Sequence, residues 1–578
     1  MMLPATSRFS PGRGAGAAGP AVTYTEPGRA VLTGPRHARR RLWTTPQRLT
    51  VTGPRPDRAA RRVRTGIETE QPAPAGTTRF CAGTSTNGYG VPKPRCDPGA
   101  DHDHRGYGYP VSNSRIPLRS YIPAEDMLAR GRAVRDRVSL TARDRAIRTE
   151  GRPSIVEFVE ATNKGRLEHL VPLRIGRMLA SPFAFYRGAA GLMALDLAGS
   201  PDTGFHAQLC GDAHAGNFGL YGTSRGEIVM DINDFDETVP GPWEWDLERL
   251  AASLVLAGRV GGANEDECRT AAADAARSYR RTAAALAQRP FLTSWSALAD
   301  ESILDRVEAD DLLDNFKKAA KKARKNTSER VVRKWTHIDD HETGIESHRF
   351  VSDPPILTTV AQEVEDAAID ALERYGSSLR ESRQGLLGRF AVADIAFRIV
   401  GTGSVGMHSY VALLHGNSGE VLVLQLKQAA PSALASVLGI AAPKHEGKRI
   451  VQGARLVQTE TDILLGWTTM AIPQPGGGNR ELPFIVRQFR NLKGGIAPEE
   501  LEPHDLDDYG RLAGALLARA HARSLDPRLI HGYLGENADF DGAVADFAVR
   551  YADRTEADHD GLAAAVRAGK LPAEEPDR

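Results

Sequence analysis

The chain has 578 residues, of which 41% are hydrophobic and 25% are charged, and its formal net charge is +1 at pH 7. This length exceeds that of a single hydrophobic core and predicts two or more domains, while the composition excludes a wholly disordered or fibrous protein. Residues 1–100 contain 16 Lys and Arg against 5 Asp and Glu, so the rest of the chain contains 58 basic and 68 acidic residues. The folded part is therefore mildly acidic, which argues against binding to nucleic acid.

The cysteines and the apolar stretches indicate in which cellular compartment we expect the protein. The four cysteines are scattered and form no C-x-x-C pair, so the sequence predicts neither a disulfide framework nor a structural zinc site. The apolar stretches fall short of the roughly 18 residues that a membrane span needs, and the N-terminus lacks the apolar core of a secretory signal. We therefore expect a cytoplasmic protein without membrane contact.

The first 120 residues have the composition of a disordered tail. Residues 1–100 contain 13 Pro and 13 Gly, and such a segment cannot bury enough apolar surface to offset its conformational entropy. Beyond the tail, hydrophobic spacing and turn residues define the elements. The elements expected up to residue 335 are helices between 121 and 190, a pair of short strands over 205–210 and 227–232, and long helices over 243–288 and 300–335.

After residue 395 the pattern changes from helical spacing to the alternation that is typical of strands. The elements expected there are strands over 397–400, 409–414 and 421–427, a helix over 445–457, strands over 463–468 and 484–489, a hinge at 491–495 and a helix over 509–524. We therefore divide the chain into a tail (1–120), a helical lobe (121–290), a helical connecting segment (291–394), a β-rich nucleotide-binding lobe (395–495) and C-terminal helices that complete the helical lobe (496–578).

An acidic loop follows each of the first two expected strands. Residues 211–217 read GDAHAGN and residues 231–237 read DINDFDE. At one edge of a short hairpin these loops would bring together carboxylate and amide oxygens, the ligands that Mg²⁺ prefers when substrate phosphates complete its coordination. Asp and Asn often cap turns as well, but two such loops in succession favour a metal site over turn chemistry.

The spacing of Asp212 and Asn217 is the D-x-x-x-x-N of the protein-kinase catalytic loop. There the Asp accepts or orients the proton of the attacking hydroxyl, and the Asn and a second-loop Asp hold the metal. On this interpretation Asp212 is catalytic with His214 assisting or positioning it, and the metal ligands are Asn217 and Asp234, with Asp231 and Asp236 as rivals of Asp234.

A glycine-rich loop, GTGSVG at residues 401–406, lies between two expected strands. In this context Gly401, Gly403 and Gly406 are typical of a loop whose backbone closes over nucleotide phosphates. The strand that follows ends in Lys427, which we expect to contact those phosphates.

A lysine buried at the end of such a strand needs a carboxylate partner, because an unpaired interior charge is costly. We expect this partner to be Glu446, on the helix after the strand, with Glu460 as the alternative. Arg174, Arg177 and Arg187 are able to clamp a phosphate or an acidic substrate, although such arginines more often pair with carboxylates.

These motifs resemble a known group of enzymes. Residues 211–217 are similar to the H-G-D-L-H-x-x-N loop of aminoglycoside-phosphotransferase-like kinases, with Cys210 in place of the first His. Residues 232–236 are similar to their I-D-F-x-D metal loop, and Asp246-Leu247 to the downstream pair that braces the catalytic loop. More broadly, residues 121 to 555 resemble the bacterial domain-of-unknown-function family 2252, through the shared stretches RIGRM (174–178), SPFAFYRG (181–188), the two acidic loops and PWEWDL (242–247).

The resemblance implies a two-lobe, protein-kinase-like α+β fold in which the order of the lobes is changed. Asp234 precedes Gly401 by 167 residues, whereas in ordinary kinases the glycine loop comes first, so we expect a circular permutation. The helix over 509–524 looks like the one that precedes the catalytic loop in the phosphotransferases. Permutation costs little where the joined ends lie close at the surface.

The sequence thus predicts an ATP- and Mg²⁺-dependent phosphotransferase that acts on a small-molecule hydroxyl. Three alternatives use parts of the same motifs. They are a nucleotide-binding regulatory module without transfer activity, a metal-dependent hydrolase that uses only the acidic loops, and a nucleotidyl transferase.

Overall fold

The computed structural model of the chain describes residues 122–142, 151–296, 302–340, 346–399, 401, 403–474 and 476–574. The tail expected over residues 1–120 lies outside the described residues. All of the described residues fall within one unit of the chain. In the described part, no helix combines the length and the apolar character needed to cross a membrane. Cys210 and Cys268 are buried free thiols.

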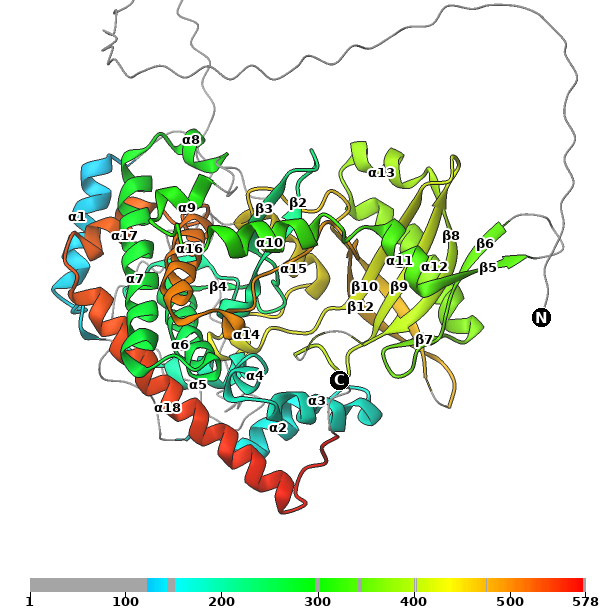
Figure 1. Cartoon of the computed structure of the whole chain (residues 1–578), viewed down its shortest axis with the longest axis horizontal. Helices are drawn as coiled ribbons and strands as arrows, with labels where there is room; N and C mark the ends of the chain where they lie inside the picture. Colours follow the sequence, from blue (N-terminus) through cyan, green and yellow to red (C-terminus); the bar gives the residue numbers. More distant parts are fainter. Residues whose placement is uncertain are drawn as a thin grey trace, which may run out of the picture. The chain divides into compact units, whose positions relative to one another are not determined.

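Four long helices form the core of the helical part (Figure 1). They are α6 (Trp243–Gly261), α7 (Glu265–Gln288), α16 (Pro503–His521) and α18 (Asp539–Arg567). Gly262, at φ 85°, ends α6 in the left-handed region, and an Asn264–Glu267 capping box begins α7. Alanines fill the buried face of α7, and Gly510 and Gly514 let α16 approach it closely. The helices expected over 243–288 and 509–524 are confirmed.

Shorter helices surround this core. They are α1 (Ala124–Arg135), α2 (Ile155–Asn163), the 3-10 turn η2 (Glu168–Leu170), α3 (Val171–Leu179), α4 (Pro182–Tyr186), α5 (Ala190–Leu197) and α17 (Pro527–Leu534). The helical character expected between residues 121 and 190 is confirmed for the described residues. Gly131 of α1 and Gly532 of α17 approach the backbone of the facing helix, so these two helices pack closely.

The short strands pair differently from the expectation. Instead of pairing with one another, β1 (His206–Gln208) pairs with β4 (Pro240–Pro242), and β3 (Ile228–Ile232) pairs with β2 (Phe218–Gly222). The apolar segment of β2 was not expected to be a strand, but the tight turn at Gly226 (φ 79°) makes it the nearest partner of β3. The acidic loops still meet, because one precedes β2, the other follows β3, and Phe218 lies opposite Ile232.

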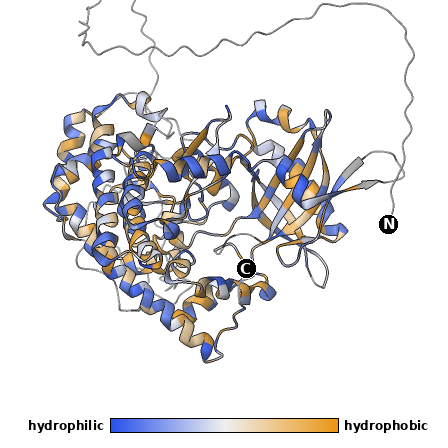
Figure 2. Ribbon diagram, viewed as in Figure 1, coloured by the Kyte–Doolittle hydropathy of each residue, from blue (hydrophilic) through white to orange (hydrophobic). Residues whose placement is uncertain are grey.

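Six antiparallel strands form the main sheet, in the order β11-β12-β10-β9-β8-β7. Their bounds are β7 (Leu357–Thr359), β8 (Phe390–Arg398), β9 (Ser409–Gly416), β10 (Val421–Gln428), β11 (Gly466–Pro473) and β12 (Asn479–Gln488). Hydrophobic residues run along these strands (Figure 2). Leu422, Leu424 and Leu426 face α12 (Gln362–Tyr375), and Val423 on the opposite face contacts the cluster that includes α11 (Ser328–Trp335). The strands expected after residue 395 are confirmed, with shifted ends.

The segment expected to connect the lobes by helices contains strands as well. Besides β7 and the start of β8, it carries the hairpin of β5 (Thr336–Asp340) and β6 (Glu346–Phe350). Its helices are α8 (Phe291–Trp295), α9 (Ser302–Arg306), α10 (Leu313–Ala323), α11, α12 and α13 (Glu381–Leu387). Two helices follow β10, namely α14 (Ala433–Val437) and α15 (Glu446–Val457), and the latter packs on β11 and β12.

The stretch expected to be a hinge, residues 491–495, is held in place by hydrogen bonds. Gly494 exchanges two backbone hydrogen bonds with Leu220 of β2, at 2.9 and 3.0 Å. Asn326 accepts a hydrogen bond from the backbone N–H of Leu492 at 3.0 Å and donates its side-chain amide to the carbonyl of Lys493 at 2.6 Å. This connection is therefore tied both to the short hairpin and to the segment between α10 and α11.

We predict that Gly514→Ala destabilises the protein. A Cβ at this position would lie 2.1 Å from the carbonyl oxygen of Ala275 on α7, and forced separation of two packed helices costs about 1–3 kcal/mol. Urea denaturation measures the free energy of unfolding. The matched control is Gly542→Ala on α18, where the added Cβ would meet only the end of Arg269 at 3.9 Å, so this variant keeps or gains stability. Equal effects of the two substitutions would contradict the close packing of α7 and α16.

Candidate functional site

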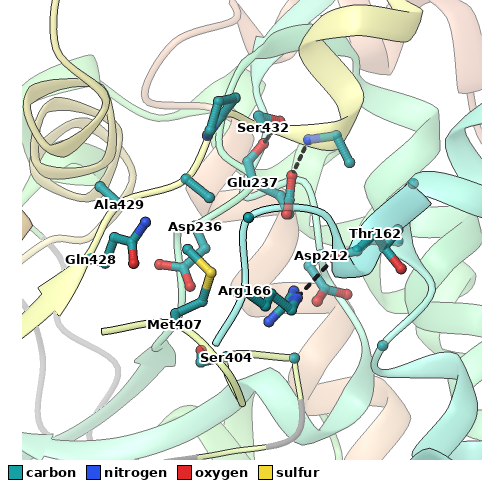
Figure 3. Close-up of a pocket in the computed structure, with 18 of the residues that line it drawn as sticks. Thr162, Arg166, Asp212, Asp236, Glu237, Ser404, Met407, Gln428, Ala429 and Ser432 are labelled. Atoms are coloured by element: carbon teal, nitrogen blue, oxygen red, sulfur yellow. Dashed lines mark hydrogen bonds between the residues drawn. The ribbon is translucent and has the colours of Figure 1, made fainter. Parts of the chain in front are cut away.

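A cavity of about 670 Å³ brings together segments that are far apart in the sequence. It is lined by both acidic loops, by the end of β10 and the residues up to 436, and by residues between 158 and 191 of the N-terminal helices. Gly401, Gly403 and Ser404 of the glycine loop, and Met407 just after it, also line the cavity. Figure 3 shows Arg166, Asp212 and Asp236 around this cavity, with Ser404 and Met407 of the glycine loop nearby. A volume of this size is typical of sites for small molecules and cofactors.

Lys427 joins the sheet to the second acidic loop. Its ammonium lies 2.5 Å from Oδ2 of Asp236 and 3.5 Å from Oδ2 of Asp234, which is 193 residues away in the sequence. The Lys427 side chain is only 5% exposed, whereas the two carboxylates, which line the cavity, retain 45% (Asp234) and 32% (Asp236) of their side-chain surface. The structure thus places three of the predicted site residues in contact.

These charges shift one another's pKa values. Burial alone would raise the pKa of Asp234, but the positive charges of Lys427 and Arg487 outweigh it and lower the pKa to about 2. Burial and the neighbouring Asp234 charge raise the pKa of Asp236, against the attraction of Lys427. Burial disfavours the ammonium of Lys427, yet the two carboxylates raise its pKa. Asp234 and Lys427 are therefore both charged at neutral pH.

Asp212 is held by an arginine that the sequence analysis missed. Arg249 of α6 donates from Nε to Oδ1 of Asp212 at 2.5 Å, and the other carboxylate oxygen, Oδ2, lies 3.8 Å from Nε2 of His214. Burial lowers the pKa of His214 to about 4. The positive charges of Arg187 and Arg249 act in the same direction, and the negative charge of Asp212 opposes them. His214 is therefore neutral at pH 7, which is compatible with positioning Asp212.

Asp246 holds the backbone of the loop that carries Asp212. Its carboxylate accepts hydrogen bonds from the backbone N–H groups of Cys210 and Gly211, at 2.8 and 3.0 Å. This is the bracing contact that the resemblance implied for Asp246. His521 of α16 lies 3.4 Å from the same carboxylate, and Tyr509 donates to the carbonyl of Ala215 at 2.6 Å. Helix α16 therefore supports the loop from the opposite end of the chain.

Asn217 connects the two acidic loops. Its side-chain amide donates to the backbone carbonyls of Asp212 and Asp234, at 3.0 and 3.2 Å, and the side chain is buried. These hydrogen bonds fix the spacing between the loops. The D-x-x-x-x-N spacing predicts that Asn217 is a metal ligand, and in the structure its side chain also joins the two loops.

The glycine loop is attached to α3 and to the segment that precedes it. Gly401 and Gly406 have φ values of 65° and 84°, which a residue with a Cβ rarely adopts. Arg177 donates to the carbonyl of Gly401 at 2.5 Å, and the backbone N–H of Leu167 donates to the carbonyl of Gly406 at 2.7 Å. The loop follows β8 and precedes β9, as the sequence indicates, and Gly401 and Gly403 both line the cavity.

Glu446 does not pair with Lys427, and this expectation is wrong. Its carboxylate accepts from Nε of Arg449, one turn along α15, at 2.6 Å. In the described residues the carboxylates that contact Lys427 are Asp234 and Asp236. The acidic loop supplies the partner because it lies against the end of β10, whereas Glu446 at the first turn of α15 lies within reach of Arg449. For the alternative, Glu460, the structure records a backbone contact, its carbonyl accepting from Tyr221.

Glu237 is a second residue that the sequence analysis missed. Its carboxylate accepts from the backbone N–H of Ala433 at 2.6 Å, and its carbonyl accepts from Ser432. Burial raises the pKa of Glu237 to about 7, against the hydrogen bond from Ala433. No spacing in the sequence connects residues almost 200 positions apart, so only the fold reveals this contact between the acidic loop and α14.

The acidic pair has the chemistry of a Mg²⁺ site that a substrate completes. Among the described residues, no group of three or more His, Cys, Asp or Glu is arranged to hold a metal by itself. Mg²⁺ commonly needs only one or two carboxylates when substrate phosphates supply the remaining oxygens. Asp234 and Asp236 could provide these carboxylates, and Oδ1 of Asp236 is buried without a hydrogen-bond partner among the described residues, so that this oxygen could accept a cation.

Comparison with known proteins identifies one family. The model of a family described as "Uncharacterized protein conserved in bacteria (DUF2252)" matches residues 166–565, which include the acidic loops, the glycine loop and α16. Neither a curated protein nor a solved structure matches the chain.

We predict that Glu237 makes the stability of the protein depend on pH. Its folded pKa of about 7 exceeds the ordinary value of 4.5, so the folded state binds the proton more tightly and stability falls as pH rises from about 4.5 to about 7. Relative to Glu237→Gln, the wild type should lose about 1–2 kcal/mol over this range, because partial exposure screens the effect.

Urea denaturation of both proteins between pH 4.5 and 8 measures this difference. The control is Glu227→Gln in the β2–β3 turn, where the carboxylate is 55% exposed. Its difference from the wild type should stay constant over the same range. A constant difference for Glu237→Gln as well would show that Glu237 has an ordinary pKa.

Proposed function

We propose that this chain, which belongs to the bacterial family DUF2252, is an ATP- and Mg²⁺-dependent phosphotransferase acting on the hydroxyl group of a small molecule. One observation carries the proposal. The ammonium of Lys427, near the end of β10, contacts Asp234 and Asp236 beside the cavity that Asp212 also lines. Phosphoryl transfer needs this combination of a phosphate-binding cation, metal-binding carboxylates and a carboxylate for the attacking hydroxyl.

Each group has a role that its surroundings support. Asp234 and Asp236 would hold Mg²⁺ together with the phosphates of ATP, and Asn217 is the third proposed ligand. The metal would supply neutralisation of the charge that develops on the transferred group. Lys427 would bind phosphate oxygens beside the two carboxylates, and the glycine loop would cover the phosphates with backbone N–H groups.

Asp212 is the proposed catalytic residue. Its ion pair with Arg249 fixes one carboxylate oxygen and leaves the other, on the side of His214, for the acceptor hydroxyl. With His214 neutral, the carboxylate is the anionic group of this loop that faces the cavity. Asp212 would orient the hydroxyl and accept its proton as the phosphoryl group is transferred.

The proposal includes a protein-kinase-like fold in circularly permuted order. The acidic loops precede the glycine loop in the chain, and α16, which follows the sheet, returns to support them. Arg519 of α16 lies 2.6 Å from Asp231 at the end of β3, and His521 lies 3.4 Å from Asp246. These contacts support the assignment of α16 as the helix that in the resembling phosphotransferases stands before the catalytic loop.

Asp212→Asn should abolish turnover while nucleotide affinity stays within about twofold of the wild type. The substitution keeps the shape of the side chain but removes the charge that orients the hydroxyl, which is worth at least about 100-fold in rate. Release of ADP from ATP·Mg²⁺ measures turnover, and isothermal titration with an ATP analogue measures affinity. Unchanged ADP release would rule out the catalytic assignment. ATP that is bound but never consumed by the wild type would instead indicate the regulatory module.

Lys427→Met should weaken the binding of ATP·Mg²⁺ by about tenfold or more, because a charge-assisted contact to phosphate is lost. It should also lower the melting temperature, since Asp234 and Asp236 lose their buried partner. The control is Lys334→Met on α11, an exposed lysine outside the lining of the cavity, which should leave nucleotide affinity unchanged. If Lys427→Met binds nucleotide as the wild type does, the phosphate-binding role of Lys427 is refuted.

A further inference from the structure

Three arginines line the cavity from one stretch of the chain. Arg166 precedes η2, Arg174 lies on α3, and Arg187 ends α4. We call these three residues the arginine cluster. They face the same cavity as Asp212 and Glu237, but they come from the N-terminal helices and not from the sheet that carries Lys427.

Neutral oxygens, not carboxylates, are the hydrogen-bond partners of Arg166 and Arg174. Arg166 donates to the backbone carbonyls of Thr162 and Val405, at 2.9 and 2.6 Å. Arg174, which is 1% exposed, donates to the side-chain oxygen of Asn163 at 2.7 Å, and within the described part of the chain its buried Nε has no hydrogen-bond partner. In the described ranges neither guanidinium forms an ion pair.

Arg187 lies beside the loop of Asp212. Its Nε is buried and has no hydrogen-bond partner among the described residues. A Cβ added to Gly216 would lie 3.7 Å from this nitrogen, and the guanidinium carbon is 5.9 Å from the centre of the Phe183 ring. The positive charge of Arg187 also acts on His214, two residues from Asp212. This arginine is therefore placed next to the proposed position of the acceptor hydroxyl.

Several other buried arginines of the chain pair with carboxylates. Arg152, Arg249, Arg280 and Arg519 each have a carboxylate oxygen within 2.6 Å, on Asp196, Asp212, Asp541 and Asp231 respectively. An arginine buried without an opposite charge is costly. Arg523 is also buried and donates to the carbonyls of Leu456 and Trp295, but it lies outside the lining of this cavity. The arginine cluster differs from these arginines because its members face a cavity large enough for a ligand.

Arg166 and Arg174 remain charged at neutral pH. Burial lowers the pKa of Arg166 to about 10, against the charges of Glu237 and Asp236. Burial and, to a lesser extent, the positive charge of Arg166 lower the pKa of Arg174 to about 9. Guanidinium groups bind phosphate oxygens in bidentate geometry, and several positive charges favour a phosphate dianion over a single carboxylate.

We infer that the arginine cluster binds a phosphate group of the acceptor, so that the substrate whose hydroxyl faces Asp212 is itself a phosphorylated small molecule. This inference rests on the proposed function and specifies its substrate class. The phosphates of the nucleotide are the other source of the same chemistry. They are assigned to Lys427 and the acidic pair, whereas Arg187 lies beside the loop that presents Asp212.

The test is to measure the melting temperature in increasing concentrations of inorganic phosphate at constant ionic strength. A ligand that binds the folded protein raises this temperature. The titration is made with and without a saturating, non-hydrolysable ATP analogue and Mg²⁺. The variant is Arg187→Gln, chosen because Arg187 is only half-buried, and Arg166→Gln is the second variant if the first does not fold. The control is Arg225→Gln in the β2–β3 turn, where the arginine is 66% exposed.

Phosphate should raise the melting temperature of the wild type and of the control, with or without the analogue, and Arg187→Gln should need at least about tenfold more phosphate for the same rise. Unaltered phosphate dependence in both cluster variants would overturn the inference. So would loss of the phosphate effect in the presence of the analogue, because the nucleotide would then occupy the arginines. If the wild type binds no analogue but Arg187→Gln still weakens phosphate binding, the proposed function fails and the phosphate site stands.

Discussion

A buried ammonium that requires opposite charge determines how the sheet meets the acidic loops. The Lys427 side chain is 5% exposed, and an interior charge of this kind is tolerated only where carboxylates compensate it. Asp234 and Asp236 do so from a loop that follows the short β2–β3 hairpin. Because each side would be destabilised without the other, this contact fixes the end of β10 against the loop and creates the wall of the cavity.

The remaining contacts position the first acidic loop relative to this pair. Asp246 holds its backbone, Asn217 sets its distance from the second loop, and Arg249 fixes the direction of the Asp212 carboxylate. Helix α16, almost 300 residues further along, supports the loop through Tyr509 and His521. The site is thus built on the rigid helical core, and the proposed chemistry depends on side chains whose orientations are set by ion pairs and hydrogen bonds.

Local pattern predicted the elements well, and long-range pairing was harder to predict. Helical spacing identified α6, α7, α15 and α16, and alternation identified β9 and β10, because each depends on neighbours in the sequence. The partner of β3 depends on which apolar segment lies closest after folding, so β2 was missed. Glu446 was the expected partner of Lys427 because it lies on the helix after the strand, whereas in the structure Asp234 and Asp236 contact the lysine. Arg249 and Glu237 belong to no sequence motif, because the residues that they contact are about 40 and 200 positions away in the chain.

The central claim is that the pair of Asp234 and Asp236 with Lys427 is a site for nucleotide and metal together. Isothermal titration of the full chain with a non-hydrolysable ATP analogue, with Mg²⁺ and then with EDTA, tests it most directly. The account predicts binding at one site per chain in Mg²⁺ and at least about tenfold weaker binding in EDTA, because the carboxylates repel phosphates unless a cation lies between them. No binding under either condition, or equal binding under both, would contradict it.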